Sequence, residues 1–102
     1  MTIQNFKLFR DKCYINGEWI EANSKDTILV NNPATLKEIG TVPKCGKEET
    51  KKAIDAANAA WPKWKSTSAK ERSIILRKWF DLIISNKEEL AQIMTIEQGK
   101  PI

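Results

Sequence analysis

Histidine is absent from the sequence, and cysteine occurs only twice, at Cys13 and Cys45. A zinc site of the usual imidazole and thiolate type therefore has too few ligands, and neither cysteine belongs to a Cys-x-x-Cys pair. Two cysteines so far apart in the sequence do not form a disulfide framework, and no neighbouring base indicates an activated nucleophile. We interpret both as ordinary reduced thiols.

Long apolar runs are also missing. No stretch approaches the ~18 consecutive apolar residues of a membrane-spanning helix, so we expect no membrane partner. Residues 1–10 lack an apolar run followed by a small-residue cleavage site, so we expect a cytoplasmic protein. The 102 residues, 41% hydrophobic and 29% charged, suit one small globular domain with a modest core and exclude two domains.

Charge of one sign does not dominate the sequence, which has 17 Lys and Arg residues and 13 Asp and Glu residues. The formal net charge of +4 raises nucleic acid as a partner, because clustered Lys and Arg release counterions from phosphates. In the second half of the chain, however, basic and acidic residues alternate, which is typical of solvent-exposed helix faces. We therefore expect no nucleic-acid partner. A weak basic nucleic-acid-binding domain and a stand-alone helical interaction module remain the two alternatives.

Residues 1–45 carry the patterns of strands and turns. Asn16-Gly17 lies between two short β-prone runs and predicts a tight hairpin, because a type I′ turn needs positive φ at both central residues. Residues 27–30 predict a further strand that ends before Pro33, and residues 38–42 predict its return strand. This half is therefore expected to form two antiparallel hairpins.

Residues 46–102 carry the patterns of three helices. Gly46 is a tolerable N-cap with Glu49 at the third helical position, and Pro62 is expected to end or kink the first helix. Ser68 and Glu71 have the spacing of a capping box, which predicts the start of the second helix.

The third helix is expected to open at Asn86, with Glu89 at its third position, and to end at Gly99. The four tryptophans could stack on bases or sugars, but Trp61 and Trp79 fall on apolar helix stripes and Trp19 falls in a hairpin. Core packing is therefore the preferred interpretation, and only Trp64 looks free.

Two segments frame the chain, Tyr14-Ile15-Asn16-Gly17-Glu18-Trp19 near its start and Glu97-Gln98-Gly99-Lys100-Pro101 at its end. With these and the strings at 8–10, 32–35, 39–44, 53–57, 70–72 and 75–82, the chain resembles the N-terminal segment of the NAD(P)-dependent aldehyde dehydrogenase superfamily. Within this superfamily, the motifs are most similar to those of the bacterial succinate-semialdehyde dehydrogenases. Eight matches in the same order leave chance a poor explanation.

The resemblance implies an α+β segment, residues 1–102, with strands and turns in 1–45 and helices in 46–102. It would be the N-terminal portion of a Rossmann-like α/β cofactor-binding domain, without the catalytic and oligomerisation domains. The family's Gly-Gln-x-Cys and Glu-Leu-Gly-Gly strings are absent, so Cys13 and Cys45 do not inherit the nucleophile's role. No catalytic or cofactor-binding residue is assigned.

The resemblance further implies an oxidoreductase whose full-length subunit oxidises a small aldehyde, succinate semialdehyde, with NADP or NAD. The segment alone would be inactive, with exposed apolar surface, and its partners would be the rest of the subunit and further copies in a homo-oligomer. Many relatives hold a monovalent cation, which would fall here on the backbone carbonyls of Val30 and Asn31 and the side chain of Glu97. Hard oxygen ligands suit such an ion.

Overall fold

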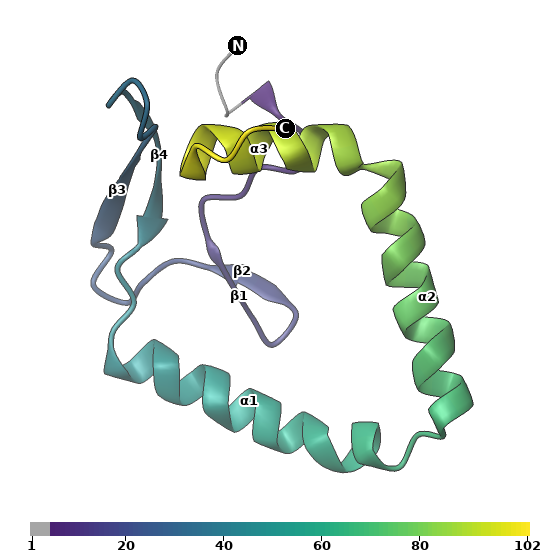
Figure 1. Ribbon diagram of the computed structural model, residues 1–102. Helices are drawn as coiled ribbons and strands as arrows, with labels where there is room; N and C mark the ends of the chain where they lie inside the picture. The colour runs from purple at the N-terminus through teal and green to yellow at the C-terminus, as the bar shows by residue number, and fades with distance from the viewer. Residues whose placement is uncertain (1–4) are drawn as a thin grey trace.

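The computed structural model describes residues 5–102 (Figure 1). Two separate two-stranded antiparallel sheets are followed by three helices, which confirms the predicted α+β order and its change near Cys45. The elements are β1 (Cys13–Ile15), β2 (Glu18–Ile20), β3 (Thr27–Asn31), β4 (Glu38–Pro43), α1 (Lys47–Lys65), α2 (Ala69–Ser85) and α3 (Lys87–Gln98).

The first hairpin joins β1 to β2 through the predicted Asn-Gly turn. Asn16 and Gly17 have φ values of 53° and 78°, as a type I′ turn requires. Tyr14 lies directly opposite Trp19, and their rings meet edge to face with centroids 5.0 Å apart. This cross-strand pair is the main side-chain contact within so short a hairpin.

The second hairpin pairs β3 with β4, and each strand extends one residue beyond its predicted end. The register shifts between Val30 and Asn31, because Val30 pairs with Gly40 and Asn31 with Glu38, so β4 has one extra residue, Ile39, at this point. In the turn itself, Asn32 Oδ1 accepts a hydrogen bond of 2.8 Å from the Ala34 N–H. This hydrogen bond to the Asn32 side chain stabilises the turn and does not require an N–H from Pro33, which has none.

Helix α1 begins as predicted, because Glu49 Oε2 accepts a 2.9 Å hydrogen bond from the Gly46 N–H. Pro62 was expected to end or kink the helix, and the first of these alternatives is wrong, since α1 continues to Lys65. Proline removes one donor but has a helical φ, and its carbonyl still accepts from Ser66. The missing hydrogen bond costs little so close to the solvent-exposed end of the helix.

The caps of α2 and α3 were predicted correctly in part. Ser68 Oγ accepts from the Glu71 N–H at 3.1 Å and starts α2, and Gly99 ends α3 with φ 82°. Asn86 does not cap α3 with its side chain. Its amide donates instead to the Leu82 carbonyl at 2.8 Å, so Asn86 satisfies the end of α2.

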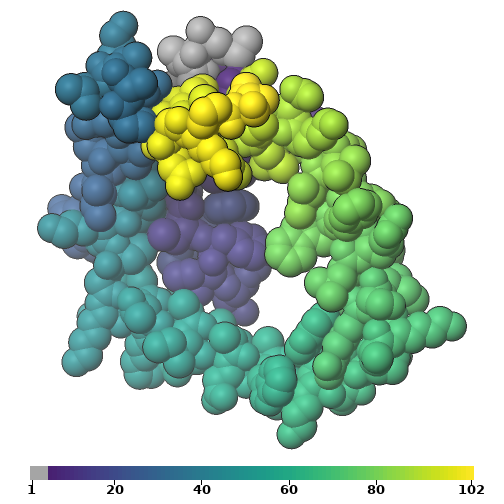
Figure 2. All heavy atoms as spheres, in the orientation of Figure 1, coloured from purple at the N-terminus to yellow at the C-terminus, as the bar shows by residue number. Residues whose placement is uncertain are grey.

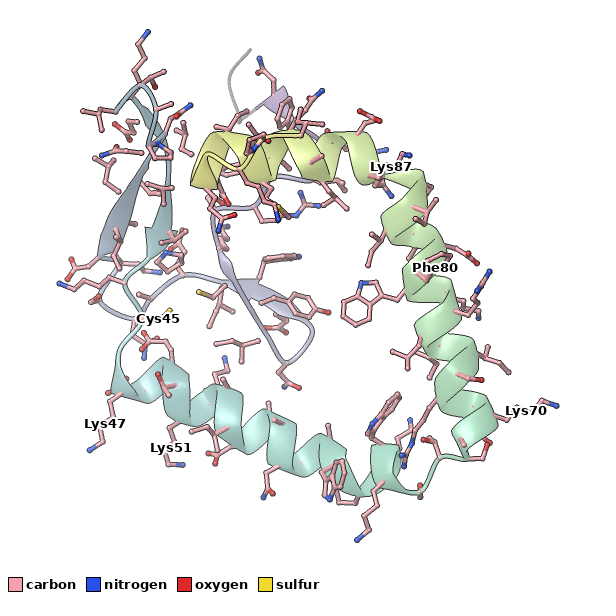
Figure 3. All side chains as sticks on the ribbon, in the orientation of Figure 1. Cys45, Lys47, Lys51, Lys70, Phe80 and Lys87 are labelled. Atoms are coloured by element: carbon pink, nitrogen blue, oxygen red, sulfur yellow. The ribbon has the colours of Figure 1, made fainter. Side chains whose placement is uncertain are left out.

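The three helices form an open frame around the first hairpin (Figures 1 and 2). The radius of gyration is 16.7 Å, whereas a compact domain of this length has about 13 Å. In Figure 3 the side chains of Lys47, Lys51 and Lys70 point away from the enclosed space. The charged helix faces are therefore on the outside of the frame.

Little apolar surface is buried within residues 5–102. Only Ala22, Ile39, Pro43 and Glu49 are buried in this part of the chain. Helix α2 has no buried residue, although its sequence is rich in large apolar side chains. Those exposed on α2 are Ile74, Ile75, Leu76, Trp79, Phe80, Leu82, Ile83 and Ile84.

The core packing predicted for Trp61 and Trp79 is wrong for this part of the chain, since both are more than half exposed. Trp64, predicted to be free, is the least exposed of the four tryptophans at 37%, and the Arg72 guanidinium lies over its ring at 5.6 Å. The apolar stripes of α1 and α2 exist, but their large side chains stay exposed within the described residues.

Among the described residues, no helix is both long and apolar enough to cross a bilayer. Residues 1–4, which belong to the stretch used to exclude a secretion leader, lie outside the described range.

Two glycines with similar positive φ offer a test of the fold. A Cβ at Gly99 would lie 3.3 Å from Pro33 Cγ in the β3–β4 turn, whereas a Cβ at Gly17 would meet nothing within 4 Å. We expect Gly17→Ala to cost about 1–2 kcal/mol of backbone strain. Gly99→Ala should cost more, because it also displaces Pro33. Urea unfolding of the two variants measures the difference, and equal losses would show that the contact between α3 and the turn contributes nothing.

Candidate functional site

The predicted cation ligands lie at one end of the molecule. Val30 and Asn31 lie on either side of the register shift at the end of β3, and Glu97 is the penultimate residue of α3. The contact between Gly99 and Pro33 brings the end of α3 against the β3–β4 turn, and Figure 1 shows the two side by side. The structure therefore joins the elements that carry the three residues.

The chemistry of this end favours a cation only weakly. The end of a helix carries partial negative charge, and Glu97 adds a full negative charge on an exposed side chain. Within residues 5–102, no three His, Cys, Asp or Glu side chains gather as metal ligands. Any cation held here would depend on backbone carbonyls, as monovalent ions often do.

The N-terminal segment closes the same end of the frame. The Glu89 carboxylate accepts hydrogen bonds from the Lys7 N–H at 2.8 Å and the Leu8 N–H at 3.0 Å. The ring of Phe9 presses on Gly40 of β4, where a Cβ would lie 2.8 Å from its edge. The sequence placed Glu89 in the first turn of α3 and gave no indication of this second role, which joins residues about eighty positions apart.

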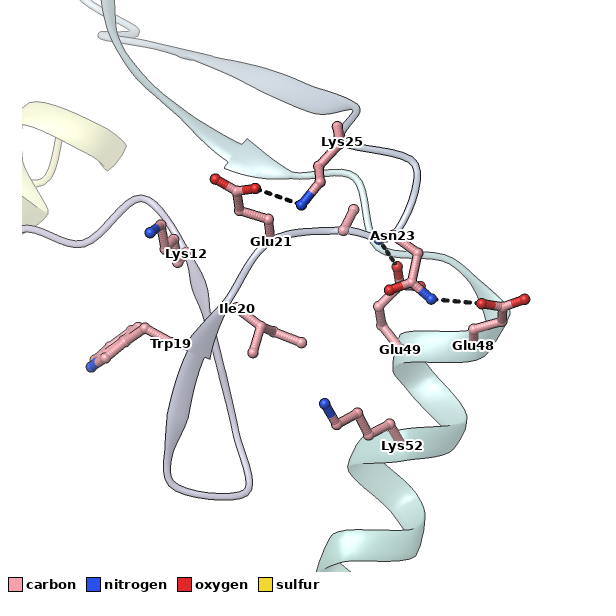
Figure 4. A pocket seen from close by; sticks show the side chains of 10 residues that line it. Lys12, Trp19, Ile20, Glu21, Asn23, Lys25, Glu48, Glu49 and Lys52 are labelled. Carbon is pink, nitrogen blue, oxygen red and sulfur yellow. Dashed lines mark hydrogen bonds and ion pairs between the residues drawn. The ribbon is translucent and has the colours of Figure 1, made fainter.

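A second junction lies where the β2–β3 connection meets α1, and it was not predicted. It lines a polar hollow of about 490 Å³ (Figure 4). The Glu49 carboxylate accepts from the Asn23 backbone N–H as well as from Gly46, and the Asn23 side chain donates to Glu48 at 2.6 Å. Lys25 pairs with Glu21 at 3.0 Å on its rim. Glu48, Glu49 and Asn23 are hydrogen-bonded at this place, so this side of the hollow is a structural junction, and Lys12 and Lys52 also line it.

Two carboxylates at this junction, those of Glu49 and Glu21, have lowered pKa values. Hydrogen bonds from the backbone N–H groups of Asn23, Glu49 itself and Gly46 lower the pKa of Glu49, because they stabilise its charged form. The hydrogen bond and positive charge of Lys25 lower the pKa of Glu21, with a smaller contribution from Lys12. Glu49 is therefore ionised at neutral pH despite being buried.

The two cysteines, separated by 32 positions, lie next to each other. The Cys45 thiol is a hydrogen-bond donor to Cys13 Sγ at 3.7 Å, and both residues are partly buried and unbridged. Burial, the hydrogen bond to Cys13 and the nearby Glu49 charge raise the pKa of Cys45. The sequence suggested two unrelated thiols, and no short-range pattern could reveal that the hairpin returns to this point.

The sequence profile described as the aldehyde dehydrogenase family matches residues 19–102. The chain belongs to the aldehyde dehydrogenase family. Over all 102 residues it is 54% identical to a glutarate-semialdehyde dehydrogenase of Pseudomonas putida and 50% identical to an NADP⁺-dependent succinate-semialdehyde dehydrogenase of Escherichia coli. The chain spans about a fifth of the length of these curated relatives, 21% of each.

Solved structures agree with the family assignment. An aldehyde dehydrogenase from Brucella melitensis superposes with a TM-score of 0.92 at 48% identity, covering 99% of this chain and 21% of that one. A succinate-semialdehyde dehydrogenase from Burkholderia pseudomallei gives 0.87 at 55% identity, covering 90% of this chain and 19% of that one. The two hairpins and three helices are thus the N-terminal portion of the aldehyde dehydrogenase fold, as the resemblance implied.

The Glu49 junction generates a prediction about pH. A lowered native pKa means that ionised Glu49 stabilises the fold above the ordinary carboxyl value of 4.5, and that this contribution is lost as the pH falls through the native pKa. Glu49→Gln should therefore lower the urea midpoint at pH 7 and flatten its fall on acidification.

Glu48→Gln is the matched control, because Glu48 is exposed and binds only the Asn23 side chain. It should leave both the midpoint and its pH dependence nearly unchanged. Equal effects of the two substitutions would contradict a special role for Glu49.

Proposed function

We propose that this chain is the leading part of the cofactor-binding domain of an aldehyde dehydrogenase subunit that oxidises a short aldehyde bearing a carboxylate. The observation that carries the proposal is identity of about half the residues, over the whole chain, to enzymes named for succinate and glutarate semialdehyde. The close superposition on aldehyde dehydrogenases supports it.

The exposed apolar helix faces indicate that the frame packs against a partner. Burying apolar surface contributes roughly 25 cal/mol per Å², and α2 leaves every one of its large apolar side chains to solvent. Contiguous exposed apolar patches of this kind indicate an interaction surface. The occupant we propose is the remainder of the same subunit, which in the relatives makes up about four-fifths of the chain.

The described residues do not fit a dinucleotide. Gly99 and Lys100 lack the spacing of a phosphate-binding loop, and in the polar hollow beside α1 the Glu49 carboxylate already accepts hydrogen bonds from the Asn23 and Gly46 N–H groups. We therefore assign NAD(P)⁺, which would accept a hydride from the substrate, to the remainder of the subunit. The role of this chain is to build the frame against which that remainder packs.

Substrate and cofactor are proposed only as classes. Succinate and glutarate semialdehydes differ by one methylene, which a binding pocket distinguishes by only about 1–3 kcal/mol. The Escherichia coli relative is named for NADP⁺, and a betaine aldehyde dehydrogenase of Staphylococcus aureus that is 33% identical was solved with NAD⁺. A homo-oligomer in the cytoplasm is part of the same proposal.

The proposal predicts the activity of the complete protein. The product of the reading frame that contains residues 1–102 should reduce NADP⁺ or NAD⁺ with succinate or glutarate semialdehyde. A positive charge that binds the substrate carboxylate contributes at least ~1.4 kcal/mol to transition-state binding. The kcat/KM for either semialdehyde should therefore exceed that for the uncharged butanal by about tenfold or more. Preference for butanal, or no turnover of any of the three, would overturn it.

We also propose that the Val30 and Asn31 carbonyls and Glu97 contribute to a potassium site at the end of α3. The register shift after Val30, the negative end of the helix and the contact of Gly99 with Pro33 support it. A bound ion stabilises the folded state in proportion to the logarithm of its concentration.

The complete protein should then melt at a higher temperature in potassium chloride than in tetramethylammonium chloride at equal ionic strength. Glu97→Gln should reduce the difference. Glu88→Gln, at the opposite end of the same helix, is the control and should preserve it. A potassium effect of the same size in Glu97→Gln would remove Glu97 from the site.

A further inference from the structure

Cys13 and Cys45 are held together by two different local structures. Cys13 starts β1 and pairs with Ile20 across the first hairpin. Cys45 immediately precedes Gly46, whose N–H is fixed by the Glu49 carboxylate. Figure 3 shows Cys45 at the entrance to α1. Each backbone is held by its own local structure, and together the two structures place the sulfurs 3.7 Å apart.

The separation suits a covalent bond. A disulfide has its sulfurs about 2.05 Å apart, so bonding requires them to approach by less than ~2 Å. Rotation about the two Cα–Cβ bonds moves a sulfur by that amount. Both side chains are partly exposed, which leaves a small reagent access to one of them.

We propose that Cys13 and Cys45 are a reversible oxidation site, at which exchange with a low-molecular-weight disulfide forms a Cys13–Cys45 disulfide that fastens the first hairpin to the start of α1.

The exchange proceeds in two balanced steps. The thiolate of one cysteine attacks the small disulfide, a protein–small-molecule disulfide forms, and half of the reagent leaves as a thiolate that takes up a proton. The thiolate of the second cysteine then attacks the first protein sulfur and releases the other half as a second thiol. Two protein thiols are oxidised, one small disulfide is reduced to two thiols, and the two protons pass to those thiols.

The hydrogen bond assigns an order to the steps. Cys45 donates its proton toward Cys13 Sγ, so Cys45 retains its proton while Cys13 Sγ is the accepting sulfur. Burial and the neighbouring Glu49 charge further raise the pKa of Cys45. Cys13 therefore attacks first and Cys45 resolves the mixed disulfide, in a step that accelerates as the pH rises toward the pKa of Cys45.

The bond would close a loop that contains all four strands. β1 to β4 lie between the two cysteines, and the hydrogen-bonded junction at Glu49 is the principal polar link between them and α1. A cross-link over such a loop restricts the unfolded chain and stabilises the fold. Thiol reductants of the kind that dominate the cytoplasm would reopen it, so the site would respond to oxidising conditions.

The test uses the complete protein equilibrated in glutathione redox buffers, alkylated and digested with trypsin. Cleavage after lysine places the two cysteines on peptides 13–25 and 45–47, so the disulfide yields one linked species of defined mass. We expect this species in the folded protein, with an effective thiol concentration at least about tenfold higher than in urea, equivalent to about 30 mV. We expect a higher melting temperature that dithiothreitol reverses.

Serine variants give matched controls. Cys45→Ser should trap glutathione on Cys13, whereas Cys13→Ser should acquire little on Cys45, and neither should show the reductant-sensitive rise in melting temperature. The peptide readout does not depend on enzyme activity, so loss of the proposed function leaves this test intact. Absence of the linked peptides from the folded wild type, or equal yields in buffer and in urea, would overturn the proposal.

Discussion

The arrangement of strands and helices depends on the hydrogen bonds that the buried Glu49 carboxylate accepts. A buried charge is costly unless hydrogen bonds satisfy it, and here the backbone N–H groups of Asn23 and Gly46 do so. One donor follows β2 and the other begins α1, so the direction of α1 relative to the first hairpin is fixed at one point. Ala22, 1% exposed and next to Asn23, packs where these segments meet.

At the opposite end of the frame, Glu89 repeats the same solution with the N–H groups of Lys7 and Leu8. Both junctions are made by carboxylates that accept from backbone donors, and little apolar burial supports either of them. Helices α1 and α2 meanwhile expose their large apolar side chains, whereas of those on α3 only Met94 is exposed and Leu90, Ile93 and Ile96 are partly buried. A frame held by polar junctions with open apolar faces suits a family in which about four-fifths of the subunit lies outside this chain.

The sequence predicted what depends on neighbouring residues. The Asn16-Gly17 turn, the Ser68 cap and the Gly99 terminator need only a few adjacent positions, and all three are present. The prediction from the sequence failed where the outcome depends on partners distant in the sequence or on the relative free energies of two alternatives. Pro62 is tolerated because few helical residues follow it, and Asn86 finds a nearer acceptor at Leu82. The partners of Cys45 and Glu89 lie 32 and 82 positions away in the sequence. The tryptophan stripes were recognised, but their partners are not among the described residues.

The candidate cation residues show the same division. Their grouping came from a family resemblance, since nothing in the local sequence connects Val30 with Glu97. The structure explains how they approach, because Gly99 in its left-handed conformation turns the chain against Pro33, two residues after the end of β3. A Cβ at position 99 would lie 3.3 Å from Pro33 Cγ, so the turn would have to move by a few tenths of an ångström. The glycine in the family-like Glu-Gln-Gly-Lys-Pro string therefore has a physical role, because it ends α3 and lets the end of the helix lie against the β3–β4 turn.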